Sequence, residues 1–232
     1  MIDIHCHILP GIDDGPKDLD ESIAMLRMAE ADGVRTIVAT PHSGGAYEEP
    51  DPDRIRELVR TVNAAAEDEG IAVEVLPGCE AQMSPDFVEK VEAGTILTLG
   101  DKGRYALVEI NATPLPAYGL DVVFKLILAG IIPILAHGER LAATKSGSLF
   151  VAMFARQGGL VQMNADAVGG LVSRELKRSC GKLLKQRWAH VIASDGHGTR
   201  HRPPLLSPCL TGFKRRDRPA ALDKYCNLNL SP

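Results

Sequence analysis

The sequence predicts an α/β fold in which seven strand–helix units close into a distorted, TIM-like (β/α)7 barrel. Short apolar runs alternate with helical patterns from the first residue to about residue 195, and a glycine follows most of the helical segments. No linker interrupts this alternation, so we expect a single domain over residues 1–232, with a core over 1–204 and a weakly patterned tail over 205–232. Seven units suit a closed barrel better than an open doubly wound sheet, which is the alternative fold.

Seven apolar runs carry the strand prediction. Each is short, is rich in Val, Ile or Leu, and is bounded by polar or turn-forming residues, which is typical of buried parallel strands. The expected strands cover residues 2–5, 34–40, 72–79, 105–110, 131–137, 160–163 and 191–194.

The segments between these runs have apolar residues at helical spacing. The first has Ile23, Leu26 and Met28 and stops before Gly33, and glycine commonly ends helices. The expected helices cover residues 20–31, 53–69, 84–93, 120–129, 149–156 and 173–188. After Gly198, prolines and a Lys/Arg cluster weaken the pattern, and we expect a loose covering helix, a loop and a solvated basic face.

Composition excludes several classes of protein. The chain has 26 basic and 30 acidic side chains, a net charge of −4, and 4% aromatic residues, which argues against nucleic-acid binding by bulk charge or base stacking. No apolar stretch approaches the roughly 20 residues of a membrane helix, and the N-terminus does not resemble a signal peptide. We therefore expect a cytoplasmic protein without membrane insertion. The five scattered cysteines indicate neither a disulfide framework nor a thiolate zinc site.

Polar side chains gather where the predicted strands end, which is the edge at which α/β folds bind ligands. Five of the seven histidines lie there, together with three acidic residues. The set comprises His5, His7, His42, Glu80, Glu109, His137, Asp195 and His197. A single such residue is more often a hydrogen-bonded core residue than a ligand, but that explanation does not account for the whole set.

Imidazole and carboxylate groups without thiolate suit Mn²⁺, Fe²⁺ or Zn²⁺. Because side chains alternate along a strand, His5 and His7 point the same way while Cys6 points away. The set is too large for one ion, so two or three are implied, and Glu80 or Glu109 could bridge two of them. Clustered ions of this kind typically lower the pKa of a water molecule for hydrolysis and neutralise a phosphoryl group. We therefore expect a phosphoesterase.

The motifs at these positions resemble those of the PHP (polymerase and histidinol phosphatase) superfamily. Within it they are most similar to the manganese-dependent bacterial protein-tyrosine phosphatases of the capsular and exopolysaccharide type, the CpsB/CapC family. The resemblance covers about residues 1–204 and implies a seven-unit PHP-type barrel with a trinuclear metal site. Its motifs are Asp3-Ile4-His5-Cys6-His7, Asp13-Asp14-Gly15-Pro16, Thr40-Pro41-His42, Pro77-Gly78-Cys79-Glu80, Leu107-Val108-Glu109, His137-Gly138-Glu139-Arg140 and Ser194-Asp195-Gly196-His197.

The resemblance also implies a distribution of ligands over three metal ions, with Glu80 as the bridge. The first ion takes His5, His7, Glu80 and Asp195, the second Glu80, Glu109 and His137, and the third Asp14, His42 and His197. On sequence alone, the Asp-Gly-Pro around Asp14 is an ordinary turn. The resemblance makes Asp14 a ligand instead.

By the same resemblance Arg140 and Arg202 bind the substrate phosphate, for which a guanidinium is well shaped. The expected reaction is direct hydrolysis without a phosphoenzyme, helped by a phenolate leaving group of pKa near 10. The implied substrate is the phosphotyrosine tail of an autophosphorylating bacterial tyrosine kinase that controls polysaccharide export. We expect His201 to be exposed. A homo-oligomer is a further expectation from the family.

Several alternatives stay open. A PHP phosphatase of a small metabolite such as histidinol phosphate would use the same metal ions, and a non-catalytic regulatory module would keep the fold alone. Cys209 and Arg215 match the C-x-x-G-x-x-R spacing of cysteine-dependent tyrosine phosphatases, but no predicted strand leads into that loop, so we interpret the match as coincidence. Gly138 and Leu141 depart from the family pattern, which has a bulkier residue or proline and an aromatic residue there. The tail departs from it as well.

Overall fold

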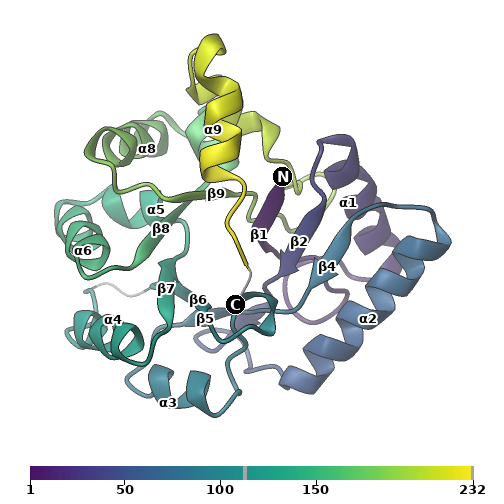
Figure 1. Cartoon of the computed structure of the whole chain (residues 1–232), viewed down its shortest axis with the longest axis horizontal. Helices are drawn as coiled ribbons and strands as arrows, with labels where there is room; N and C mark the ends of the chain where they lie inside the picture. The colour runs from purple at the N-terminus through teal and green to yellow at the C-terminus, as the bar shows by residue number, and fades with distance from the viewer. Residues whose placement is uncertain (112–113, 231–232) are drawn as a thin grey trace.

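The computed structural model describes residues 1–111 and 114–230 and has a ring of parallel strands surrounded by helices (Figure 1). All paired strands in this part of the chain run parallel. The strands are β1 (Ile2–Cys6), β2 (Thr36–Ala39), β3 (His42–Ser43), β4 (Glu74–Leu76), β5 (Glu80–Gln82), β6 (Tyr105–Glu109), β7 (Ile132–Leu135), β8 (Leu160–Asn164) and β9 (Val191–Ala193).

Two sheets share the ring. One has the order β1-β2-β4 and the other β3-β5-β6-β7-β8-β9. On one side an isolated bridge between Cys6 and Gly196 links β1 to the segment after β9, and the Asp195 amide donates to the His5 carbonyl at 2.8 Å. On the other side, β2 leads into β3 and β4 into β5, so the ring is a curled α/β barrel, as predicted.

Two expected strands are wrong in their extent. The segments 34–40 and 72–79 each contain one short strand, and a second short strand follows in the other sheet. Pro41 separates β2 from β3, and Pro77 with Gly78 separates β4 from β5. A proline has no N–H to donate to a sheet, so each strand is interrupted there. As a result, Glu80 is the first residue of β5, where its amide donates to the Pro41 carbonyl at 3.0 Å.

The expected helices are confirmed, with shifted ends. They are α1 (Leu19–Ala31), α2 (Pro52–Asp68), α3 (Phe87–Glu92), α4 (Gly119–Leu128), α6 (Lys145–Arg156) and α8 (Arg174–Gln186). Helix α6 begins four residues before its expected start at residue 149, because the Thr144 hydroxyl caps it by accepting from the Gly147 amide at 3.0 Å. The structure has two further short helices: α5 (Gly138–Ala142) begins shortly after β7, and α7 (Ala165–Gly169) directly follows β8.

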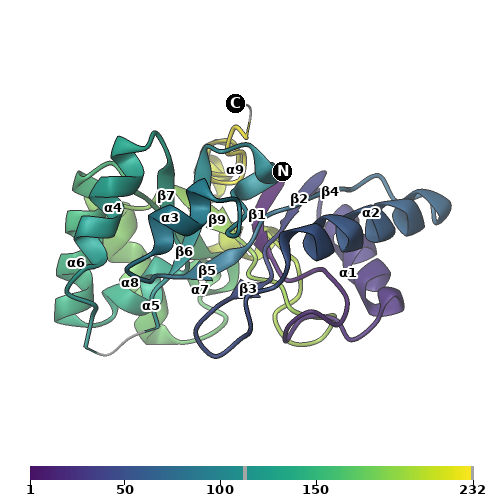
Figure 2. The same ribbon diagram turned by 90° about the horizontal axis from the view of Figure 1, so that it is seen from below.

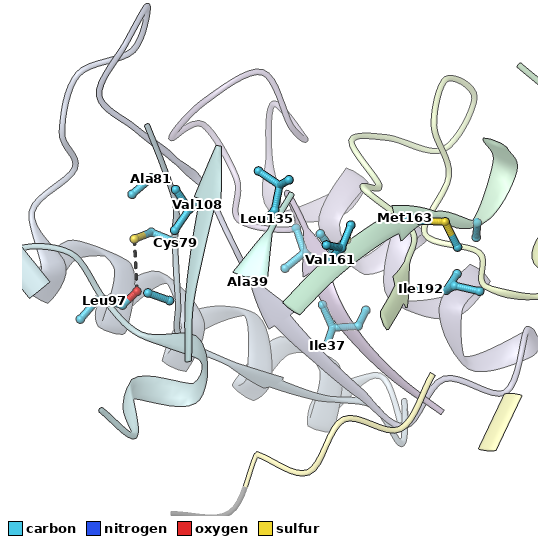
Figure 3. Packing of buried hydrophobic residues seen from close by; sticks show 14 of the residues in the cluster. Ile37, Ala39, Cys79, Ala81, Leu97, Val108, Leu135, Val161, Met163 and Ile192 are labelled. Atoms are coloured by element: carbon cyan, nitrogen blue, oxygen red, sulfur yellow. Dashed lines mark hydrogen bonds between the residues drawn. The ribbon is translucent and has the colours of Figure 1, made fainter. Parts of the chain in front are cut away.

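Apolar side chains form two clusters on the two faces of the strands. The larger cluster lies between the strands and the helices and includes Ile37, Val108, Leu135 and Val161 (Figure 3). The smaller cluster takes residues of the opposite register from nearly every strand and therefore fills the barrel interior. Its buried members are Ile4, Val38, Leu99, Tyr105, Leu107, Ile134, Ala136, Val191 and Ala193.

The tail closes one end of the barrel. Beyond β9 the chain forms two short 3-10 turns, Ser207–Gly212 and Arg215–Asp217, and then α9 (Arg218–Tyr225). A further 3-10 turn, Leu99–Asp101, precedes β6. Leu228 and Leu230 then pack against the interior cluster, and the Ile2 amide donates to the Cys226 carbonyl at 2.8 Å. The segment after α9, up to Leu230, therefore lies over the centre of the ring (Figure 1), on the side opposite β3 (Figure 2). Among the described residues, no helix has the length and apolar character needed to span a membrane.

Candidate metal centre

The nine residues expected as metal ligands lie together at the end of the barrel away from the C-terminal tail. They come from every expected strand end except the sixth, and from the loop after β1. Most are buried, whereas the side chain of Asp14 is 41% exposed and that of His42 is 12% exposed. The set is His5, His7, Asp14, His42, Glu80, Glu109, His137, Asp195 and His197.

An irregularity in β1 aims the first two histidines. The register with β2 shifts between Asp3 and Cys6, which marks a bulge. Bulges commonly lie next to active sites, where they redirect side chains. Ile4 faces the barrel interior, yet the next residue, His5, reaches the same interior space, as does His7. Cys6 packs in the outer cluster, as the alternation predicts.

Glu80 is the hub of the cluster. Its Oε2 lies 3.2 Å from His5 Nε2, 3.4 Å from His7 Nε2 and 3.2 Å from His42 Nδ1. Its other oxygen, Oε1, lies 3.0 Å from His137 Nε2. One carboxylate thus faces four histidines from three different strand ends, which is the position a bridging ligand needs.

Two further carboxylates complete the inner part of the cluster. Glu109 Oε1 lies 3.3 Å from His137 Nε2, so Glu109, His137 and Glu80 form one group. Asp195 Oδ1 lies 3.4 Å from His5 Nε2 and 3.7 Å from His7 Nε2. These contacts bring together the residues of the first two ligand groups that the family resemblance implies, and His42 lies with Glu80 and Glu109 as well.

The third expected group lies nearer the surface. Asp14 Oδ1 is 3.4 Å from His42 Nε2 and 3.3 Å from His197 Nε2. The loop that holds Asp14 passes tightly against β1, because a Cβ on Gly15 would lie 2.6 Å from the His7 carbonyl oxygen. The interpretation of this segment as an ordinary turn therefore misses its main constraint, which is close packing against a histidine of the site.

The spacing and chemistry of these groups fit metal ions. Two ligand atoms bound to one ion at about 2.1 Å stand roughly 3.0–3.4 Å apart, which matches the separations around Glu80. Glu80 Oε2 and His197 Nε2 are buried without a hydrogen-bond partner among the described residues. Buried polar atoms are normally satisfied, and a cation would supply the missing partner. Glu80 belongs to two of the three groups of ligand atoms that lie within 4.8 Å of one another.

The backbone is strained at three expected site residues. His137, Asp195 and Arg202 have φ values of 32°, 55° and 51°, a region that residues other than glycine seldom adopt. Such conformations are costly and concentrate at functional sites. They are stabilised here by surrounding contacts: the His137 amide donates to Gln162 Oε1 at 2.6 Å, and the His197 amide donates to the Arg202 carbonyl at 2.8 Å.

Asp13 is a residue of the centre to which sequence reasoning assigned no role. Its Oδ2 accepts from His7 Nδ1 at 2.7 Å and from the His42 amide at 3.1 Å, and its Oδ1 accepts from the Gly15 amide at 2.9 Å. A carboxylate behind a histidine fixes the ring so that the other nitrogen faces the metal. The sequence has two adjacent aspartates before Gly15, and only Asp14 is expected as a ligand. The second aspartate was therefore the available signal for a supporting role of Asp13.

A polar pair on β8 also supports the centre. Gln162 Oε1 lies 3.2 Å from His5 Nδ1, and Gln162 Nε2 donates to Asn164 Oδ1 at 2.8 Å. Asn164 Nδ2 in turn donates to Asp195 Oδ2 at 2.8 Å. The sixth strand was predicted without a site residue, although a glutamine within a buried apolar run is itself a signal.

At the rim, the Tyr47 ring stacks on His42 with a centroid separation of 4.2 Å.

The charges of the centre determine how its histidines titrate. Burial disfavours the charged His7 ring, but Asp13 and Glu80 outweigh burial and raise its pKa to about 10. Carboxylates likewise overcome burial at His137 and raise its pKa to about 10. Burial and the adjacent His7 lower the pKa of His197 to about 3. Burial opposes ionisation of Glu80, yet neighbouring histidines hold its pKa well below its usual range.

The two expected phosphate-binding arginines stand at the edge of this centre. Arg140, in α5, donates from Nη2 to Asp195 Oδ2 at 2.7 Å. Arg202 lies between Asp195 and Asp14, with guanidinium nitrogens 3.5 Å from a carboxylate oxygen of each. The arginine side chains are 42% and 37% exposed, so both border solvent. His201, next to Arg202, is exposed, as predicted.

Cys209 lies outside this arrangement. It sits in the 3-10 turn Ser207–Gly212, is fully buried and packs in the outer apolar cluster. A nucleophilic thiol must be reachable by its substrate. The structure therefore contradicts the cysteine-dependent alternative and agrees with its interpretation as a coincidence of spacing.

Two known proteins that are similar to this chain are both named tyrosine-protein phosphatases. Tyrosine-protein phosphatase YwqE of Bacillus subtilis (strain 168) is 33% identical over 202 residues, which are 87% of this chain and 79% of that protein. Tyrosine-protein phosphatase CpsB of Streptococcus pneumoniae is 34% identical over 212 residues, which are 89% of this chain and 86% of that protein.

A solved structure gives the same result for the fold. It comes from a study of YwqE from Bacillus subtilis and CpsB from Streptococcus pneumoniae, described as unique metal-dependent tyrosine phosphatases. The match has a TM-score of 0.87 and 31% identity, and covers 96% of this chain and 91% of the other. The family model described as "Capsular polysaccharide synthesis, CpsB/CapC" matches residues 1–229. The chain is therefore a member of the CpsB/CapC family.

Proposed function

We propose that this chain is a metal-dependent protein-tyrosine phosphatase that hydrolyses phosphotyrosine with water and without a phosphoenzyme. The observation that carries the proposal is Glu80, which faces four histidines from three strand ends while Arg140 and Arg202 stand at the rim. Relatives about one-third identical over most of their length have names that specify the same activity.

Two or three divalent ions occupy the centre in this proposal. The proposed ion is Mn²⁺, which the family resemblance implies, and Fe²⁺ or Zn²⁺ would be accepted by the same imidazole and carboxylate groups. Bound ions lower the pKa of water and neutralise phosphoryl oxygens. The proposed ligands are His5, His7, Asp14, His42, Glu80, Glu109, His137, Asp195 and His197.

Arg140 and Arg202 bind the phosphate and stabilise the charge that develops on it. A guanidinium has five N–H groups, so an arginine held by one carboxylate oxygen keeps donors for a phosphate. Their bonds to Asp195 and Asp14 tie the phosphate site to the expected ligands. The phenolate of tyrosine, with a pKa near 10, leaves more readily than an alkoxide and needs less help from a general acid.

The proposed substrate is a phosphotyrosine protein, and the proposed partner is an autophosphorylating bacterial tyrosine kinase that controls capsular or exopolysaccharide synthesis. The description of the family to which the chain belongs names capsular polysaccharide synthesis, which supports this role. The alternative, a phosphatase of a small metabolite such as histidinol phosphate, is not favoured by the relatives.

The test compares two substrates side by side. Chelator-treated full-length protein is given Mn²⁺ and assayed for phosphate release from a phosphotyrosine peptide and from histidinol phosphate. We expect faster turnover of the peptide, restored only by the metal. Preference for histidinol phosphate would move the function to metabolism, and the absence of metal-dependent release from either substrate would contradict the phosphatase proposal.

A further inference from the structure

A cavity of about 490 Å³ opens beside the candidate metal centre, between helix α5 and the described residues 110–111 and 114–115. His137 and Arg140 line one end of it, so it adjoins the proposed phosphate site directly. The rest of the lining is mostly aliphatic, with Ile110, Leu115 and Leu141, and includes the polar side chains of Asn111, Thr144 and Ser146. This volume lies within the range of small-molecule sites, about 300–1,000 Å³, and exceeds what a phosphate alone needs.

A second hollow borders the centre on the opposite side but has a different character. Its volume is about 690 Å³, and its lining includes Lys17, Asp20, Glu21 and Arg200. An aromatic ring gains free energy by leaving water for an apolar surface, whereas it gains nothing by displacing water from charged groups. Of these two hollows, only the aliphatic one suits the ring of a substrate.

We propose that the ring of phosphotyrosine lies in the aliphatic cavity, which we call the ring pocket and define by Ile110, Leu115 and Leu141. This inference rests on the proposed function. The ring is joined to phosphorus through a single oxygen, so a phosphate held at Arg140 places the ring in the adjoining space. Phosphoserine and phosphothreonine have no ring to fill the pocket, which makes these three side chains determinants of selectivity for aryl phosphates.

Leu141 is held firmly at the wall of this pocket. The Thr144 amide donates to the Leu141 carbonyl at 3.3 Å, and helix α6 packs against the same carbonyl so closely that a Cβ on Gly147 would lie 1.9 Å from it. Resemblance to the family predicts an aromatic side chain at this position. A leucine here leaves more of the cavity open than an aromatic residue would.

The test measures binding rather than turnover. The Mn²⁺-loaded full chain is titrated calorimetrically with phenylphosphonate and with methylphosphonate, which share the anionic group and differ in the ring. We expect the wild-type protein to bind phenylphosphonate more tightly. Leu141→Ala and Leu115→Ala should each lower the affinity for phenylphosphonate about tenfold, which is the scale of a lost contact in an apolar pocket. The affinity for methylphosphonate should stay within about twofold of the wild-type value.

Leu149→Ala is the matched control, because Leu149 lies on the neighbouring helix α6 and is 63% exposed. It should change neither affinity. Equal weakening of both phosphonates by the pocket variants, or no weakening of either, would overturn the proposal. Because binding is measured, a protein that prefers phenylphosphonate but does not hydrolyse phosphotyrosine would refute the proposed function while supporting the ring pocket.

Discussion

The two ends of the barrel interior are made by the same strands but differ completely in chemistry. Along β6, the interior positions pass from Tyr105 and Leu107, which pack in the apolar cluster, to Glu109, which faces His137 at the candidate metal centre. Along β1, the change from Ile4 to His5 takes a single residue, because the bulge keeps both inside. The alternation of a strand decides which side chains enter the barrel, and their position along the strand decides whether they stabilise the fold or form the site.

The largest expected effect is at the polar end. Glu80→Gln removes the charge on the proposed bridge and should lower kcat/KM by at least about 1,000-fold, which corresponds to roughly 4 kcal/mol of lost transition-state stabilisation. Steady-state hydrolysis of a phosphotyrosine peptide, with metal analysis of the purified protein, measures this. Glu89→Gln on the exposed face of α3 is the control. Retention of full activity and metal by Glu80→Gln would remove the basis for the proposed centre.

At the apolar end the expected effect is on stability. Leu107 is 1% exposed, so Leu107→Ala leaves a cavity and should lower the free energy of unfolding by about 2–5 kcal/mol. Urea denaturation followed by circular dichroism measures this, with the exposed Leu149→Ala as a control that should change it by less than about 0.5 kcal/mol. At temperatures where the variant is folded, kcat/KM should stay near the wild-type value. A loss of activity comparable to that of Glu80→Gln would show that the two ends are not separate.

A smaller effect is expected one contact away from the ligands. Asp13→Asn removes the charge that orients and polarises His7, so Mn²⁺ affinity should fall roughly 10- to 100-fold. Calorimetric titration with Mn²⁺ measures this. Asp18→Asn, at the N-cap of α1, makes the same chemical change nearby and should leave the affinity unchanged. Identical Mn²⁺ affinity in Asp13→Asn and the wild type would mean that Asp13 only shapes its loop.

The last expected effect is a pH dependence of metal binding. His7 and His137 have pKa values of about 10 without metal, so both carry a proton at neutral pH that must leave before the nitrogen binds an ion. Mn²⁺ affinity should therefore rise with pH, by about tenfold per pH unit for each proton released, and fall as the medium is acidified. Titrations at pH 6.5 and 7.5, in buffers of different ionisation enthalpy, count the protons. Affinity that does not vary with pH would contradict the protonated state of these rings.

Much of the fold and of the candidate site follows from the sequence. The alternation of apolar runs and helical segments is a local pattern, so it predicts seven strand–helix units and six of the helices. Because parallel strands end at the same edge, the clustering of His5, Glu80 and Asp195 also follows once the strands are placed. The resemblance to a known family adds Asp14, Arg140 and Arg202, to which composition and spacing assign no role.

Other features depend on contacts between segments far apart in the chain. Asp13 and Gln162 each carry a sequence signal, but the signal does not specify a partner. Their partners, His7 and His137, are brought against them only when the chain folds. Short helices such as α5 have too few residues for a periodic pattern, and their position is set by the strand before them.

The sequence by itself determined the order of the elements, the identity of the polar strand ends and the buried faces, because these depend on periods of two and 3.6 residues along one segment. Only the tertiary structure decided that Glu80 is the hub, that a bulge brings Ile4 and His5 to the same side, and that Leu228 closes the other end. These features arise when the strands curl into a ring. The distances between side chains from different strands are then set by register and curvature, which no single segment encodes.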